Sequence, residues 1–163
     1  MMLANLLLAA ALASPVAAAA PEVTARAKVL MRADEASQPQ ARTLFEQAAG
    51  QGSGPAAYYL GLMFKNGMGG PQDSAAALRW LELAAQRGVA PAMFIVANML
   101  LESDEARARY WLDAACEQEH PEALMQKAIA TKEGAMGYAR SDAQSTLLIR
   151  MAEHAMGHRG KEP

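Results

Sequence analysis

The chain has 163 residues, a length that suits one domain whose core needs no disulfide or metal to hold it together. Its 15 basic and 17 acidic residues give a net charge of −2 without a strongly basic block, which argues against nucleic acid or an anionic membrane surface as a partner. Aromatic residues make up only 6%, whereas alanine and methionine are plentiful, so the composition favours closely packed helices over a β-sheet.

Residues 1–20 are typical of a secretory signal peptide. They carry no charged side chain, and their apolar run, about residues 3–13, is too short to span a bilayer comfortably. Small residues in an A-x-A pattern follow, which predicts cleavage after Ala18, Ala19 or Ala20. We therefore expect export to a bacterial periplasm, with no integral membrane domain after cleavage. Because no Lys or Arg precedes the apolar run, an uncleaved segment that tethers the protein to a membrane is the alternative.

Residues 21–157 contain four similar segments, which predict an array of helical repeats. The segments lie near residues 25–55, 56–91, 92–122 and 123–157, and a tail of residues 158–163 follows. They open on alanines separated by 31, 36 and 31 residues, namely Ala25, Ala56, Ala92 and Ala123. Four residues later comes an expected packing position, held by Val29, Leu60, Val96 and Lys127. The next position is small in three of the four segments, where it holds Gly61, Ala97 and Ala128.

The second half of each segment predicts a helix with a capped start and an apolar stripe. Its expected N-cap residues, whose side chains accept backbone N–H groups, are Ser37, Asp73, Asp104 and Ser141. Small and apolar residues recur after steps of four, three and four residues and end at Ala48, Ala84, Ala115 and Ala152. Each segment therefore predicts a helical hairpin, with helices near residues 22–34, 37–50, 55–66, 73–87, 91–102, 104–118, 121–133 and 141–157.

These hairpins predict an all-α fold, a right-handed α/α superhelical solenoid of about four helical hairpins. No single hairpin can bury its apolar side, so neighbours must stack around one continuous core. Gly52 and Gly88 are expected to end second helices, and Glu119 stands at the counterpart of Gly88. Lys127, a charged residue in a packing position, indicates an end that is loosely packed, acts as a cap or meets another chain.

Residues 57–88 closely resemble the Sel-one-like repeat, a tetratricopeptide-type hairpin. The stretch reads AYYLGLMFKNGMGGPQDSAAALRWLELAAQRG and carries the leucine-glycine pair, the glycine loop, the aspartate, the tryptophan, the paired alanines and the final glycine of that repeat. The segment after it keeps Asp104, Ala108, Trp111 and Ala115 but lacks the glycine loop. The resemblance implies a scaffold that binds a protein or peptide partner within an envelope or secretion assembly.

The glycine loop NGMGGPQD, residues 66–73, is interpreted as a turn rather than a phosphate site. A phosphate-binding loop needs a lysine and a Ser or Thr directly after its last glycine, whereas here Pro71 and Gln72 follow. Asp73 would also repel an anion at the helix start. His154 and His158 have metal-ligand spacing but no third ligand, and Cys116 falls in a small-residue slot.

The sequence therefore predicts no cofactor, no metal site and no catalytic constellation. The leading hypothesis is an exported non-enzymatic adaptor. The alternative is an envelope hydrolase or binding protein for a peptidoglycan-like or β-lactam ligand, because some exported Sel-one-like proteins have been linked to such ligands. Those proteins are disulfide-rich, whereas this chain has one cysteine.

The candidate partner-binding residues follow from the resemblance, because first helices line the concave side of tetratricopeptide-like arrays. In each segment, the residues two positions before and two positions after the packing position would point into this side. Residues one helical turn further along the same helix would do so as well. They are Tyr58, Leu62, Lys65, Phe94, Asn98, Leu101, Met125 and Ile129. Two interpretations remain open, an exposed anchor for a partner's extended segment or helix, or ordinary core between helices.

Overall fold

The computed structural model describes residues 15–158, which fold into eight α-helices and one short 3-10 helix without a strand. This confirms the all-α fold. The elements are α1 (Pro15–Ala33), η1 (Glu35–Ser37), α2 (Gln38–Gly50), α3 (Gly54–Asn66), α4 (Ser74–Gln86), α5 (Ala90–Leu100), α6 (Glu105–Glu117), α7 (Pro121–Glu133) and α8 (Asp142–Gly157). Within residues 15–158, no helix is both long and apolar enough to cross a membrane.

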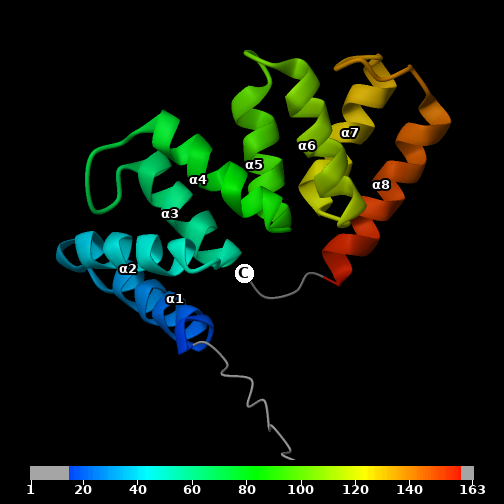
Figure 1. Ribbon diagram of the computed structural model, residues 1–163. Helices are drawn as coiled ribbons and strands as arrows, with labels where there is room; N and C mark the ends of the chain where they lie inside the picture. Colours follow the sequence, from blue (N-terminus) through cyan, green and yellow to red (C-terminus); the bar gives the residue numbers. More distant parts are fainter. Residues whose placement is uncertain (1–14, 159–163) are drawn as a thin grey trace, which may run out of the picture.

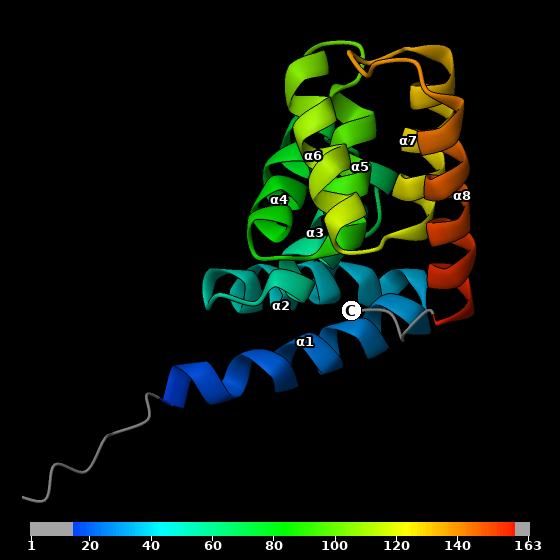
Figure 2. The same cartoon turned by 90° about the vertical axis from the view of Figure 1, so that its right-hand side faces the viewer.

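The helices pair as four hairpins, α1–α2, α3–α4, α5–α6 and α7–α8. We call α1, α3, α5 and α7 the first helices and α2, α4, α6 and α8 the second helices. Figures 1 and 2 show the hairpins following one another along a curved path that has α1 and α8 at its two ends. The second helices α2, α4 and α6 also contact the first helix of the next hairpin, so one core runs through the array.

Small side chains bring the two helices of a hairpin close together. Gly61 of α3 is buried against α4, where a Cβ on this residue would lie 2.6 Å from Cγ of Leu81. The last residues of the predicted stripes are fully buried in all four second helices, at Ala48, Ala84, Ala115 and Ala152. Leu60 and Val96 are fully buried as expected, so the packing positions of the second and third hairpins are confirmed.

The packing position predicted for the first hairpin was wrong. Val29 is 68% exposed and Ala25 is also exposed, whereas Ala20, Thr24 and Ala27 form the buried line of α1. The helix starts at Pro15, seven residues before the predicted residue 22. As the end helix of the described array, α1 packs mainly on α2 and reaches α3 through the Lys28 side chain, so its buried side is narrow and follows no pattern shared with the other first helices.

Side-chain caps start three of the second helices. The side-chain oxygens of Asp73, Asp104 and Ser141 each accept a hydrogen bond from the backbone N–H three positions later in the chain. The N–O distances are 2.8, 3.1 and 3.2 Å. Ser37 precedes α2 as expected but makes no such bond. Instead Asp34 accepts the N–H of Ser37 at 2.7 Å and caps the 3-10 turn that leads into α2.

The glycine loop at residues 66–73 is a turn, as predicted, and it packs against the preceding hairpin. Gly67 ends α3 at φ 66°, in the left-handed region. A Cβ on Gly69 would lie 2.6 Å from the carbonyl carbon of Gln38 on α2. The Arg42 guanidinium donates to the carbonyl oxygen of Pro71 at 3.2 Å and lies 3.9 Å from the centre of the Phe64 ring.

The loop of the last hairpin is held in the same way. Arg109 of α6 donates to the carbonyl oxygen of Gly137 at 3.2 Å. Arg42 and Arg109 occupy equivalent positions, each directly after an alanine of the buried stripe. The α3–α4 hairpin has Leu78 at this position, and the hairpin after it has only a short link, residues 101–104, with no long loop to anchor. Each of these two long loops is therefore anchored by an arginine on the second helix of the preceding hairpin.

The second helices of the first three hairpins end in a left-handed residue. Gly52 and Gly88 have φ values of 101° and 83°, and the equivalent Glu119 has φ 54°. Glycine adopts this conformation without steric cost, whereas the Cβ of a glutamate crowds the backbone.

Replacing Glu119 with glycine is expected to raise the free energy of unfolding by about 1 kcal/mol, because the glutamate backbone is strained. Gly88→Ala should lower it by about 1 kcal/mol, since a Cβ at Gly88 meets only Nε2 of Gln118, at 4.0 Å, and conformation alone is tested. Urea unfolding measures both changes. Equal stability of both variants and the wild type would contradict this account.

Candidate partner-binding site

Seven of the eight predicted residues lie on the three consecutive helices α3, α5 and α7, Leu101 follows directly after α5, and none of the eight is fully buried. We call the surface they form the first-helix face. Lys65, Asn98 and Ile129 are exposed, and Ile129 retains 52% of its accessible surface. Tyr58, Phe94, Leu101 and Met125 are half-buried and pack against the core, while Leu62 is half-buried. The face thus combines features of both interpretations, since its apolar side chains are anchored in the core and still reach solvent.

On α3, Tyr58 belongs to an aromatic cluster at the N-terminal end of the array. Its ring meets the buried Tyr59 edge-on, with centroids 5.2 Å apart. Tyr59 stacks on Phe45 of α2 at 5.4 Å and carries Nζ of Lys28 4.5 Å from its ring centre. The position of Tyr58 is therefore fixed by contacts that join α1, α2 and α3. Lys65 lies in the last turn of the same helix.

On α5, the ring of Phe94 stacks on His120, with centroids 5.1 Å apart and an interplanar angle of 27°. His120 is the residue just before α7, so this stack links the α5 part of the face to the next hairpin. Asn98, one turn after Phe94, donates its amide to the Phe94 carbonyl oxygen at 2.9 Å. This contact within the helix directs the amide along α5.

On α7, Met125 and Ile129 line an open hollow of about 410 Å³, which we call the α7 hollow. The other residues that line it are Glu122, Gln126, Ala130, Glu133, Ala135 and Met136. Met125 and Ile129 are thus brought together, and the His120 imidazole, with Nδ1 3.4 Å from Oε2 of Glu122, connects the hollow to Phe94. The contacts of Tyr58 lie at the opposite end of the array.

Sequence reasoning missed four residues here, His120, Glu122, Glu133 and Met136. Glu122 precedes Met125 by three positions and Glu133 follows Ile129 by four, so helical spacing could have placed both carboxylates on the face. His120 directly precedes Pro121 between two predicted helices, a position that gave no sign of a contact with the face. Met136 lies in the loop after α7, where no periodicity could have indicated its contribution.

Polar contacts behind α7 explain the charged residue in its packing position. Nζ of Lys127 lies 2.7 Å from Oδ1 of Asp113 on α6, and the Tyr138 hydroxyl donates to the same oxygen at 2.7 Å. Burial, together with this hydrogen bond, raises the pKa of Tyr138 well above its ordinary range. The ion pair therefore attaches α7 to α6, and the hydrogen bond attaches the loop after α7 to the same carboxylate of α6.

Cys116 lies beside this cluster and is buried, as its place in a small-residue slot predicts. Burial raises the pKa of its thiol to about 11, although Lys127 acts in the opposite direction. The thiol is therefore protonated at neutral pH and poorly reactive. His154 and His158 are exposed, with ring centroids 4.5 Å apart.

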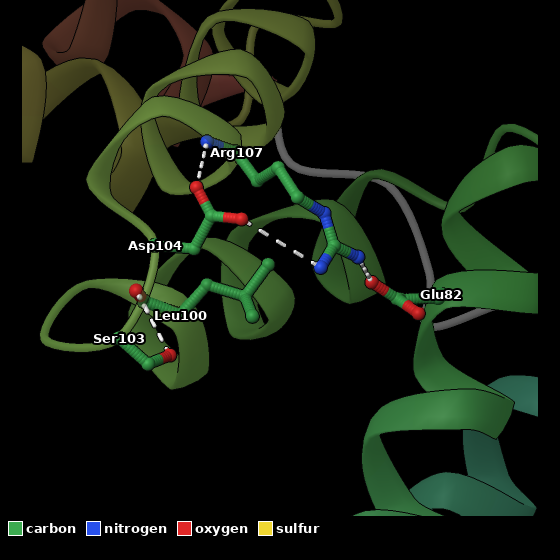
Figure 3. Close-up of polar contacts among 5 residues, drawn as sticks. All are labelled: Glu82, Leu100, Ser103, Asp104 and Arg107. Carbon is green, nitrogen blue, oxygen red and sulfur yellow. Dashed lines mark hydrogen bonds and ion pairs between the residues drawn. The ribbon is translucent and has the colours of Figure 1, made fainter.

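An ion pair on the second helices fixes the α3–α4 hairpin relative to the α5–α6 hairpin. Figure 3 shows Arg107 of α6 reaching Glu82 of α4 while its backbone N–H bonds to the cap Asp104. The guanidinium also lies 3.8 Å from the second oxygen of Asp104. The same cap region contains a bond from the Ser103 hydroxyl to the carbonyl oxygen of Leu100 at 3.4 Å. These contacts help to set the spacing between α3 and α5.

The model of the Sel1 repeat family matches three consecutive segments of the chain, residues 34–53, 54–89 and 90–120. These segments contain α2, the α3–α4 hairpin and the α5–α6 hairpin. Among curated proteins, an uncharacterised protein of Neisseria meningitidis serogroup B is 34% identical over 83 residues. The match covers 51% of this chain and 18% of that protein, so the chain spans only a small part of its relative.

Two crystal structures have similar folds. A Sel1 repeat protein from Oxalobacter formigenes superposes with a TM-score of 0.70 at 19% identity, over 88% of this chain and 58% of that one. A protective antigen of uropathogenic Escherichia coli strains, which displays an SLR fold, superposes with a TM-score of 0.76 at 29% identity. The second match covers 83% of this chain and 30% of the antigen.

Stability is expected to fall as pH rises from about 9 to about 11. In the unfolded chain the Cys116 thiol loses its proton near its ordinary pKa of 9.0, whereas the folded protein holds it until about 11. Deprotonation therefore favours unfolding in this interval. Cys116→Ala, which introduces the residue found at the equivalent Ala49 and Ala85, should reduce the slope. Urea midpoints measured across this range test this, and identical slopes for both proteins would refute it.

Proposed function

Because the chain belongs to the Sel1 repeat family, we propose that it is an exported, non-enzymatic adaptor that binds a protein or peptide partner through the first-helix face. Proteins of this family generally act as protein-interaction modules. Nothing in residues 15–158 or in the family comparisons supports the hydrolase alternative.

One observation carries the proposal. Three successive first helices present a large apolar side chain at the same position, namely Tyr58, Phe94 and Met125, and all three remain partly accessible. Such a row is a suitable anchor for an extended segment or an amphipathic helix, which would bury apolar side chains across several hairpins. Methionine adapts its shape to the partner, while the stacked aromatic rings supply rigid contacts.

Phe94→Ala combined with Ile129→Ala is expected to weaken partner binding at least tenfold, because both changes remove apolar anchors from the face. The matched control is Tyr110→Ala with Leu147→Ala, which removes side chains that are 64% and 57% exposed on second helices. Crosslinking in the native cell envelope, followed by quantification of the recovered partner, compares the variants.

Circular dichroism and thermal unfolding establish that the variants fold. If the folded Phe94 and Ile129 variant recovers its partner as well as the wild type does, the first-helix face is not the binding surface. An equal loss in the control variant would likewise point to a general effect of removing exposed apolar groups.

We further propose that the signal peptide is cleaved after Ala18 or Ala19. The Thr24 hydroxyl donates to the carbonyl oxygen of Ala20 at 2.7 Å, and Ala20 is buried, so cleavage at either site leaves this contact intact, whereas cleavage after Ala20 would remove it. Residues 1–14 lie outside the described part of the chain. Pro21 also disfavours cleavage directly before it.

The intact mass of protein purified from the periplasm is expected to correspond to a chain that begins at residue 19 or 20. A mature protein that retains residues 1–18 would contradict cleavage and favour the membrane-tethered alternative. Fractionation of the same cells separates the two cases, because a tethered protein sediments with the membranes.

A further inference from the structure

We propose that the α7 hollow selects the partner's chemistry and accepts an extended peptide segment in which two basic residues flank apolar ones. This inference rests on the proposed function, because it names the kind of segment that the first-helix face binds. The apolar floor, the charge of the rim and the spacing of its two carboxylates support it.

The floor of the hollow is apolar. It is formed by Met125, Ile129, Ala130 and Met136, within a volume of about 410 Å³. Ile129 is the most exposed of the apolar residues on the face, at 52%, so a side chain placed here removes apolar surface from water. The two methionines are flexible enough to pack around different apolar groups.

The rim of the hollow is acidic. Glu122 and Glu133 lie at its two ends, and the remaining polar lining residue is Gln126. No lysine or arginine among the described residues lines the hollow. His120 lies beside Glu122 and is charged only when it is protonated. A carboxylate at each end of an apolar floor favours a cationic partner and disfavours an anionic one.

The spacing of the carboxylates favours an extended segment. Glu122 and Glu133 are eleven positions apart on α7, which corresponds to about 16 Å along the helix axis. An extended peptide covers this distance in about five residues, and basic residues six positions apart lie on the same side of it, so their flexible side chains can reach both carboxylates. Alternate side chains between them can then point towards Met125 and Ile129.

The probe for this proposal is a fluorescein-labelled peptide, Lys-Ala-Leu-Ala-Leu-Ala-Lys, with a C-terminal amide. Control peptides replace both lysines with glutamate or both leucines with serine. Fluorescence anisotropy titrations at low and physiological salt are expected to show binding of the basic-apolar peptide and at least fivefold weaker binding of both controls. The affinity should fall as salt is added, because the rim pairs are exposed.

Protein variants locate the effect. Glu122→Gln with Glu133→Gln should weaken the lysine peptide about three- to tenfold and reduce its salt dependence. The matched control, Glu117→Gln with Glu153→Gln, removes the same charge from exposed positions that do not line the hollow and should leave the affinity unchanged. Ile129→Ser should weaken binding through the floor while keeping the salt dependence.

The outcomes separate this inference from the proposed function. Equal binding of the lysine and glutamate peptides, or an unchanged affinity in the rim variant, overturns the acidic selection. If the Phe94 and Ile129 variant still loses its cellular partner, the face remains the binding surface. Self-association that Ile129→Ser abolishes, without competition from the peptide, would show that a second copy fills the hollow and would also overturn the inference.

Discussion

The array depends on the close approach of helices at positions where the side chain is absent or very small. Gly61 lets Leu81 occupy the space of a Cβ, and alanines end the buried stripe of each second helix. Close approach places more atoms of each helix within van der Waals distance of its neighbour, so the packing energy comes from backbone proximity as much as from large side chains. A larger residue at Gly61 would separate α3 from α4 and shift every later hairpin.

Polar contacts then determine how one hairpin sits on the next. Arg42 and Arg109 bind carbonyl groups of the loop in the following hairpin, and Arg107 pairs with Glu82 across the second helices. Each contact is modest where it is exposed to water, because solvent and salt weaken it. Acting between rigid helices, however, these contacts restrict sliding and rotation, which apolar packing alone restrains poorly. The first-helix face inherits its spacing from them.

The sequence predicted the parts of the fold that repeat and failed where an element is used once. Seven of the eight helices described in residues 15–158 begin and end within a few residues of their predicted bounds, because the caps and alanine stripes recur in each hairpin. The prediction failed for α1, where Val29 is exposed, because this end helix packs mainly on α2 and buries a line through Thr24 and Ala27. The candidate site shows the same difference between features that repeat and features that occur once. Helical spacing placed Met125 and Ile129 on one surface, but Met136 came from a loop and His120 from a turn.

The energetics of the face indicate how large a partner contact must be. Covering the exposed half of Ile129 is worth about 1 kcal/mol, and each half-buried apolar neighbour adds a similar amount. Association itself costs about 4–15 kcal/mol in lost freedom, so the α7 hollow alone can support only weak binding. A tight complex must therefore extend over α5 and α3 as well. In the proposed complex, affinity would then depend on the spacing between hairpins, and the contacts of Arg42, Arg107 and Arg109 would support binding without touching the partner.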